Sequence, residues 1–184
     1  MGKKNVEIHA KLIDASRKGD QQAMYKLYKL YVQAMYNISA RMVANQYDAE
    51  DIIQESFIKA FNNLGSFRGE SSFGSWLKRI VINQSITFLK SKKQEFADID
   101  NLQIVNEENE ESNFPKIDPA VIHETIKTLP EKARVVLNLY LLEGYRHKEI
   151  AEILSITEST SKSQYLRAKQ LLREKLKKEI RYEY

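Results

Sequence analysis

The spacing of the apolar residues constrains this chain more than any other feature of its sequence. Over residues 6–35 they recur every three or four positions, and the same spacing returns over residues 52–61, 76–90 and 119–154. This is the period of an amphipathic α-helix. Only six glycines and three prolines interrupt the 184 residues, and both residue types disfavour helix interiors. The sequence therefore predicts an all-α fold.

The segment between the two helical blocks has a different composition. Residues 95–118 hold eight acidic side chains and one basic one, whereas residues 1–94 hold fifteen basic and eight acidic, and residues 119–184 thirteen and nine. An acid-rich stretch without helical period is typical of a linker. We therefore predict two small helical domains, 1–94 and 119–184, joined by a flexible acidic linker over 95–118. The basic excess of both domains indicates a polyanionic partner, and a solvated helical surface is the alternative.

Composition also argues against several classes of protein. The chain has no cysteine, so it forms no disulfide and no thiolate metal site. Its three histidines, His9, His123 and His147, do not form the Glu-x-x-His pairs of a helical di-iron site. No uncharged apolar run approaches the ~20 residues of a membrane span, and no secretory signal is visible. We expect a soluble, cytoplasmic protein that inserts in no membrane, binds no metal or cofactor and is not an enzyme.

Capping residues mark two helix boundaries in the first block. Gly19 is suited to end one helix and Asp20 to cap the next. Asp48 is expected to cap the helix that contains the sequence DAEDIIQES. The stretch Leu64–Ser75, with three glycines and many serines, is expected to be a loop. A helix over Trp76–Lys90 should follow it.

The second block ends in two helices joined by a short corner. Helices expected over Ala120–Leu129 and Pro130–Leu142 precede this pair. The first helix of the pair, His147–Leu154, is followed by the turn Ser155-Ile156-Thr157, in which Thr157 can cap the second helix. This is the pattern of a helix-turn-helix, and an ordinary helical hairpin is the alternative.

In a helix-turn-helix, the second helix enters the major groove of DNA. Two residues depart from the usual pattern: Ser155 stands where glycine is common, and Ser161 stands where an apolar residue usually packs against the first helix. Arg167 lies further along the second helix, where it is better placed for phosphates. The residues expected at the leading end of this helix are Ser159, Thr160, Lys162, Ser163 and Gln164.

Aromatic and basic residues surround the predicted loop of the first block. Phe67, Phe73 and Trp76 bracket a segment that holds Arg68. Rings stack on unpaired bases at ~1–3 kcal/mol each, and cations follow the nucleic-acid backbone. A loop rich in glycine and serine can close around a base turned out of the duplex. The alternative is that these rings belong to the core.

The helix before that loop carries a polar stripe. Asp51, Gln54 and Glu55 lie beside the apolar residues Ile52 and Ile53. Such a stripe is a solvated face, a carboxylate metal site or a docking surface for a partner. The sequence pattern alone leaves these three interpretations open.

Four stretches of the chain resemble, in the same order, the motifs of one known family. They are DAEDIIQESFIKAF, FRGESSFGSWLKRIVIN, LPEKARVVLNLYLLEGYRHKEIAEIL and TSKSQYLRAKQLLREKL. The family is that of the extracytoplasmic-function (ECF) sigma factors of bacterial RNA polymerase. The resemblance covers almost the whole chain outside the linker.

This resemblance implies separate roles for the two domains. The first would dock on the clamp helices of the largest polymerase subunit and would recognise and melt the promoter −10 element. The second would read the −35 element as duplex and contact the flap of the other large subunit. The acidic tether would run through the RNA exit and active-site region. Core RNA polymerase and promoter DNA are thus the expected partners, and an anti-sigma factor is a third.

The resemblance also assigns residues to these roles. The polymerase-docking residues are Asp51, Gln54 and Glu55, supported by Ile52 and Ile53. The residues assigned to the −10 element are Phe67, Arg68, Phe73, Trp76, Lys78, Arg79 and Asn83. The residues that match the −35 reader are Thr160, Lys162, Ser163 and Arg167.

Three positions depart from the family pattern. Ser161 and Gln164 replace a common valine and a common arginine, and Thr87 replaces a common aspartate. Because of these departures, the exact −35 sequence that the protein reads cannot be predicted, whereas the predicted role as a sigma factor is unaffected. Two other functions fit parts of the pattern: a free-standing helix-turn-helix regulator that binds an operator as a dimer, and a helical adaptor that never contacts DNA.

Overall fold

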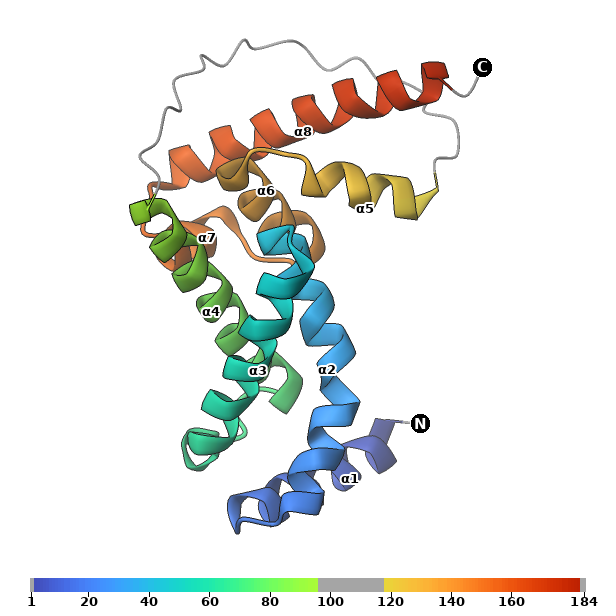
Figure 1. Ribbon diagram of the computed structural model, residues 1–184. Helices are drawn as coiled ribbons and strands as arrows, with labels where there is room; N and C mark the ends of the chain where they lie inside the picture. Colours follow the sequence, from blue (N-terminus) through green and yellow to red (C-terminus); the bar gives the residue numbers. More distant parts are fainter. Residues whose placement is uncertain (1, 96–117, 183–184) are drawn as a thin grey trace. The chain divides into compact units, whose positions relative to one another are not determined.

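The computed structural model describes residues 2–95 and 118–182, and all regular elements within these ranges are helical (Figure 1). The prediction of an all-α fold is confirmed. The chain divides into two compact units, one built mainly from α1 to α4 and the other from α5 to α8. The predicted linker, 95–118, falls almost entirely outside the described residues. The exact domain boundaries therefore stay a prediction.

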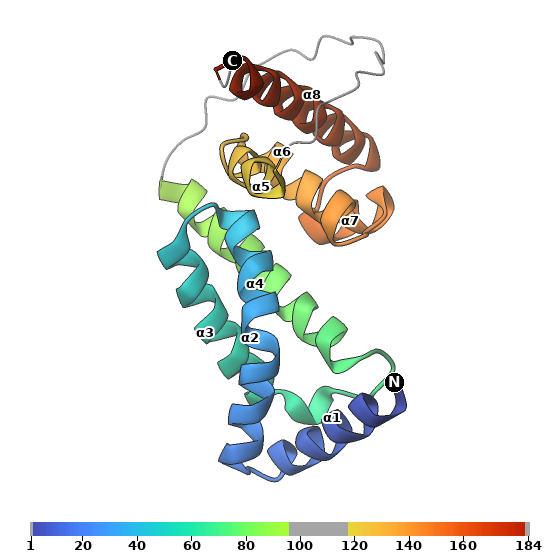
Figure 2. The ribbon, with the colours of Figure 1, turned by 90° about the vertical axis from the view of Figure 1, so that its right-hand side faces the viewer.

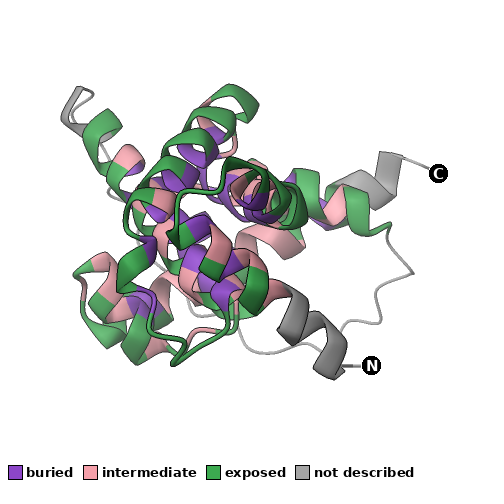
Figure 3. Ribbon diagram, turned by 90° about the horizontal axis from the view of Figure 1, so that it is seen from below, coloured by how far each residue is buried: buried purple, intermediate pink, exposed green. Residues whose placement is uncertain are grey.

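The first unit is a bundle in which α2, α3 and α4 pack along one another, while α1 crosses near one end beside a short 3₁₀ turn, η1 (Figures 1 and 2). Its elements are α1 (Gly2–Arg17), α2 (Gln21–Val43), α3 (Gln46–Asn62), η1 (Leu64–Ser66) and α4 (Phe73–Glu95). The helices carry buried residues on one side and exposed residues on the other (Figure 3). Core residues drawn from these elements include Leu27, Ile52, Phe57, Leu77 and Val81.

The boundary between α1 and α2 follows the sequence prediction. Gly19 has φ +89°, a left-handed conformation that glycine adopts without steric cost. The Asp20 carboxylate accepts hydrogen bonds from the backbone N–H groups of Gln22 and Ala23, at 2.8 and 3.1 Å. Asp20 is therefore the N-cap of α2, as predicted.

The start of α3 differs from the prediction. Asn45, and not Asp48, is the N-cap, because its side-chain oxygen accepts the Asp48 N–H at 3.1 Å. Asp48 lies in the first turn, where a negative charge also suits the helix dipole. Its carboxylate forms an ion pair with Lys92 of α4, at 3.1 Å.

The start of α4 also lies earlier than predicted, at Phe73 instead of Trp76. Ser72 satisfies the first turn, since its hydroxyl oxygen accepts the Ser75 N–H at 3.2 Å. Gly74 is required by close packing: a Cβ built there would lie 3.0 Å from the ring of Tyr31 on α2. Ser72, Gly74 and Ser75, which the sequence analysis placed in a loop, therefore form the capped and closely packed start of α4.

The second unit consists of α5 (Pro119–Lys127), α6 (Glu131–Leu137), a π-helical turn η2 (Asn138–Leu142), α7 (His147–Leu154) and α8 (Glu158–Tyr182). The single helix predicted over Pro130–Leu142 is therefore divided, with Pro130 as its N-cap. Asp118 caps α5 by accepting the Ala120 N–H at 2.9 Å. The helices enclose a core made of Ile126, Leu129, Ala133, Leu137 and Ala168.

Candidate nucleic-acid interfaces

The outer face of α3 carries the predicted polar stripe. Asp51, Gln54 and Glu55 are exposed, whereas Ile52 and Ile53 are each only 3 % exposed and belong to the core. Residues three and four apart lie on one face of a helix, so the three polar side chains face solvent together. The two isoleucines anchor the helix to the bundle and hold that face outward.

A shallow hollow of about 470 Å³ adjoins this stripe between α2 and α3. It combines apolar and polar side chains, including two tyrosines and Gln54 of the stripe. The lining residues are Tyr28, Val32, Gln33, Tyr36, Gln46, Glu50, Ile53 and Gln54. The described residues contain no cluster of three or more carboxylates or imidazoles placed to hold a metal ion.

The three aromatic residues predicted for the −10 element form one cluster. The ring centroids of Phe67 and Phe73 lie 5.7 Å apart, and those of Phe67 and Trp76 5.4 Å apart. Phe67 and Phe73 are buried, while Trp76 is half-buried. The packing thus favours the core interpretation for the two phenylalanines. Trp76 packs on both phenylalanine rings and is not fully buried.

The cluster continues onto α2 and α1. Tyr31 packs edge-on against Phe73, with ring centroids 5.2 Å apart, and its hydroxyl lies 2.9 Å from His9 Nδ1. Burial raises the pKa of the Tyr31 phenol above its ordinary value. The phenol therefore stays neutral at physiological pH.

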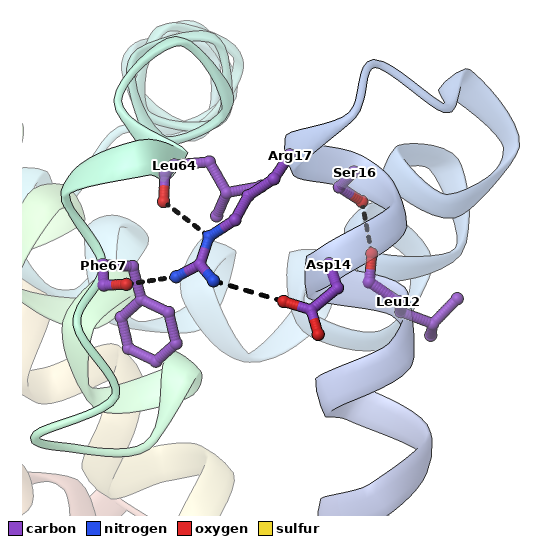
Figure 4. Close-up of polar contacts among 6 residues, drawn as sticks. All are labelled: Leu12, Asp14, Ser16, Arg17, Leu64 and Phe67. Carbon is purple, nitrogen blue, oxygen red and sulfur yellow. Dashed lines mark hydrogen bonds and ion pairs between the residues drawn. The ribbon is translucent and has the colours of Figure 1, made fainter.

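The loop between η1 and α4 is exposed from Arg68 to Ser72. Ser72 holds its far end through the cap of α4. Its near end is held by Arg17 of α1, whose guanidinium donates to the backbone carbonyls of Leu64 and Phe67 (Figure 4). Sequence reasoning missed Arg17, because nothing in a local pattern connects residues fifty positions apart.

The solvent side of α4 presents two of the predicted residues together. Arg79 and Asn83 are exposed and lie one turn apart on the same face. Lys78 is half-buried and turned from that face. Thr87, one turn beyond Asn83, is also exposed, and its hydroxyl donates to the Asn83 carbonyl at 2.9 Å. The loop, Trp76 and this stripe therefore follow one another from the start of α4 along its length.

In the second unit, the corner between α7 and α8 has helix-turn-helix geometry. Ser155 adopts the left-handed conformation, with φ 58° and ψ 46°, which explains why glycine is common at such a position. Thr157 caps α8 by accepting the Thr160 N–H on its hydroxyl oxygen at 3.0 Å. Ile150 of α7 is fully buried. The predicted bounds of α7 and the predicted Thr157 cap are both confirmed.

Behind the second helix, a polar contact replaces the expected apolar packing. Ser161 is fully buried, and its hydroxyl lies 2.9 Å from His147 Nδ1 on α7. The His147 ring stacks on Tyr140 with centroids 4.3 Å apart and an interplanar angle of 13°. Tyr165 of α8 closes the group at 4.6 Å from Tyr140. Burial raises the pKa of the Tyr165 phenol, with a further rise from Tyr140. Sequence reasoning had treated Ser161 only as a packing defect.

The residues predicted to read the −35 element fall into two groups by burial. Ser159, Thr160 and Lys162 are exposed at the start of α8. Ser163, Gln164 and Arg167 are half-buried. The Gln164 amide oxygen is buried, and no donor from the described residues reaches it. Leu166, which the sequence analysis did not select, is 54 % exposed on the same face as Lys162.

The charge of Lys162 is already paired within the protein. Its ammonium lies 2.7 Å from a Glu158 carboxylate oxygen one turn earlier on α8. The hydrogen bond and positive charge of Lys162 lower the pKa of the exposed Glu158 carboxyl below its ordinary value. A phosphate that approaches Lys162 therefore competes with this carboxylate.

Two family models match the chain, one for each unit. Sigma-70 region 2 matches residues 27–95, and Sigma-70 region 4 matches residues 120–172. The ECF RNA polymerase sigma-E factor of Escherichia coli (strain K12) is 32 % identical over 182 residues, which cover 92 % of this chain and 95 % of that protein. The chain belongs to the ECF sigma factors. It is a sigma factor for promoter-specific transcription initiation, and the alternative of a free-standing regulator is not favoured.

Further relatives agree with this assignment. The RNA polymerase sigma-H factor of Pseudomonas aeruginosa (strain PAO1) is 30 % identical over 178 residues, which cover 90 % of this sigma factor and 92 % of that protein. Among solved structures, the sigma factor RpoE in complex with the anti-sigma factor NepR from Bartonella quintana shares the fold, with a TM-score of 0.57, 23 % identity and coverage of 83 % and 96 % of the two chains. CnrH, solved with the cytosolic domain of CnrY, gives a TM-score of 0.54 at 20 % identity and coverage of 92 % and 97 %.

Proposed function

We propose that this sigma factor binds core RNA polymerase through the outer face of α3 and reads promoter DNA through two separate surfaces. Asp51, Gln54 and Glu55 would contact the largest polymerase subunit. The loop after η1, with Trp76 and the exposed stripe of α4, would receive the −10 element. The leading end of α8 would read the −35 element, and its unit would contact the other large subunit.

One observation carries this assignment. At the docking helix and at the helix-turn-helix, the residues that anchor the motif are buried and polar residues face solvent. On α3 the anchors are Ile52 and Ile53, and on the helix-turn-helix they are Ile150 and Ser161. A helix with its apolar face committed to the core offers only the opposite face to a partner.

The proposed action is binding and not covalent chemistry. Lys and Arg side chains supply attraction to phosphates that is independent of sequence, and polar side chains at base edges supply discrimination. Unstacking at the −10 element costs a few kcal/mol per step, which stacking on an accessible ring such as Trp76 offsets in part. The two readers act together when the polymerase holds both elements.

The chain organisation proposed with this function is a −10 and docking domain over 1–94, an acidic linker over 95–118 and a −35 domain over 119–184. Two structural neighbours were solved with anti-sigma factors or a partner's cytosolic domain, and we propose an anti-sigma factor as a further partner here. No helix in the described part of the chain has the length and apolarity to cross a membrane. We place the protein in the cytoplasm, where RNA polymerase acts.

Reconstituted transcription tests this proposal. The purified sigma factor is combined with core polymerase and genomic DNA, and run-off transcripts are sequenced to map their 5′ ends. We expect a set of start points that share two upstream elements and that disappear without the sigma factor. A chain that binds an operator without polymerase, or binds polymerase without giving any start point, would contradict the proposal and support the regulator or the adaptor.

A further inference from the structure

Arg17 is the last residue of α1 and lies outside residues 27–95, which the region 2 model matches. Its Nε donates to the Leu64 carbonyl at 3.3 Å, and one terminal nitrogen donates to the Phe67 carbonyl. The other terminal nitrogen binds Asp14 at 3.2 Å. The guanidinium carbon also lies 5.8 Å from the centroid of the Phe67 ring. One side chain therefore holds two carbonyls and one ring (Figure 4).

The two carbonyls have a specific place in the chain. The Leu64 carbonyl also accepts the Phe67 N–H at 3.2 Å, which closes η1. The Phe67 carbonyl is the last one before the exposed residues 68–72. Arg17 thus fixes the backbone at the point where the loop begins, while the Ser72 cap fixes the point where it ends.

The Phe67 ring extends this support to the tryptophan. It packs against Phe73 and against the half-buried Trp76. A guanidinium suits this position because its planar fork presents several donors in fixed directions and its face stacks on an aromatic ring. A lysine ammonium is a single point charge and cannot reproduce that geometry.

We propose that Arg17 is a positioning residue for −10 recognition. It holds the start of loop 68–72 and the Phe67–Trp76 pair in one arrangement, so the loop receives an unpaired base without first losing conformational freedom. Preorganisation of this kind raises affinity by lowering the ordering cost of binding. The inference rests on the function proposed above, since it assumes that this loop meets the −10 strand.

Three variants test the inference. Arg17→Met removes the donors and keeps much of the length, Arg17→Lys keeps the charge, and the control Lys18→Met removes one exposed charge from the adjacent position. Holoenzyme made with each variant is titrated with a short single-stranded oligonucleotide that carries the −10 non-template sequence of a promoter mapped by run-off transcription. Affinity for core polymerase and thermal unfolding are measured in parallel. Trp76, the one tryptophan of the chain, reports its environment by emission in the free protein.

We expect Arg17→Met to lower oligonucleotide affinity about tenfold, or about 1.4 kcal/mol, and to shift the Trp76 emission. Arg17→Lys should recover part of the affinity, and Lys18→Met should match the wild type. Affinity for core polymerase should be equal in all four proteins.

An Arg17→Met protein that binds the oligonucleotide as Lys18→Met does would overturn the inference. So would a parallel loss of core affinity and thermal stability, which would indicate a general structural role. If the wild-type holoenzyme itself fails to bind the oligonucleotide, the proposed −10 function falls as well. If instead the wild type and Arg17→Met bind the oligonucleotide equally well, only the inference about Arg17 fails and the proposed −10 function stands.

Discussion

At the scale of single residues, the pairing of Lys162 with Glu158, at 2.7 Å, sets an expectation for DNA binding. If Lys162 contacts a phosphate, Lys162→Ala should weaken −35 binding and reduce the salt slope by about one unit. Glu158→Gln should strengthen binding a few-fold, because it removes both a competitor and a negative charge. Anisotropy titrations of a labelled −35 duplex with holoenzyme, over a range of salt concentrations, measure both effects.

Glu174→Gln provides the matched control for this pair. It removes the same charge from the same helix, far from the leading end. It should leave the affinity and the slope as in the wild type. An unchanged salt slope in Lys162→Ala would exclude a phosphate contact at that residue.

The exposed stripe of α3 gives a second expectation for single residues. Asp51→Ala and Gln54→Ala should each weaken binding to core polymerase about tenfold, about 1.4 kcal/mol, and leave thermal unfolding unchanged, since both side chains are exposed. Glu70→Ala removes an exposed acid from the loop between η1 and α4, away from the α3 stripe, and controls for the loss of charge. Competition binding against the wild-type protein measures the effect. Equal affinities for core polymerase would refute the docking role of α3.

At the scale of elements, the contact between α7 and α8 is the one most open to test. Ser161→Ala should destabilise the second unit by about 1 kcal/mol, because it leaves His147 Nδ1 without its hydrogen-bond partner. With His147→Ala already in place, the same substitution should cost less. The difference between the two costs is the coupling free energy of the pair.

Unfolding of the two units can be followed separately, because Trp76, the one tryptophan of the chain, lies in the first unit. Far-UV circular dichroism follows the helices of both units during urea unfolding, whereas emission from Trp76 follows only the first unit. The two substitutions should move the circular dichroism transition and leave the emission transition in place. Strictly additive effects on unfolding would show that Ser161 and His147 do not interact.

Sequence periodicity predicted some of these elements well and others poorly, for physical reasons. Exposure of Asp51 and burial of Ile52 follow from the helical period alone, and the Thr157 cap follows from local chemistry. The cap of α3 was misplaced because Asn45 and Asp48 are both good caps, and only the backbone path decides between them. Arg17 and the His147–Ser161 pair stayed hidden because each depends on tertiary packing between separate elements.

At the scale of the whole molecule, the two matched regions lie mainly in different compact units. The two basic domains attract DNA phosphates, but residues 95–118 carry eight acidic side chains and one basic one and repel them. We therefore expect the free protein to bind DNA weakly. Strong binding then requires a partner that holds both units on one promoter. A joined pair of weak binders gains affinity only when the geometry allows both to engage.

Insertion of base pairs between the two promoter elements tests this dependence on geometry. Five added pairs turn the −35 element by about half a helical turn relative to the −10 element, since a turn spans about 10–10.5 pairs. With the polymerase holding both units, initiation should fall more than tenfold in run-off assays. The same five pairs placed upstream of the −35 element should have no effect, because they leave the spacing unchanged. Initiation that survives the internal insertion would mean that one unit suffices to select the promoter, and that α8 does not read DNA in the initiating complex.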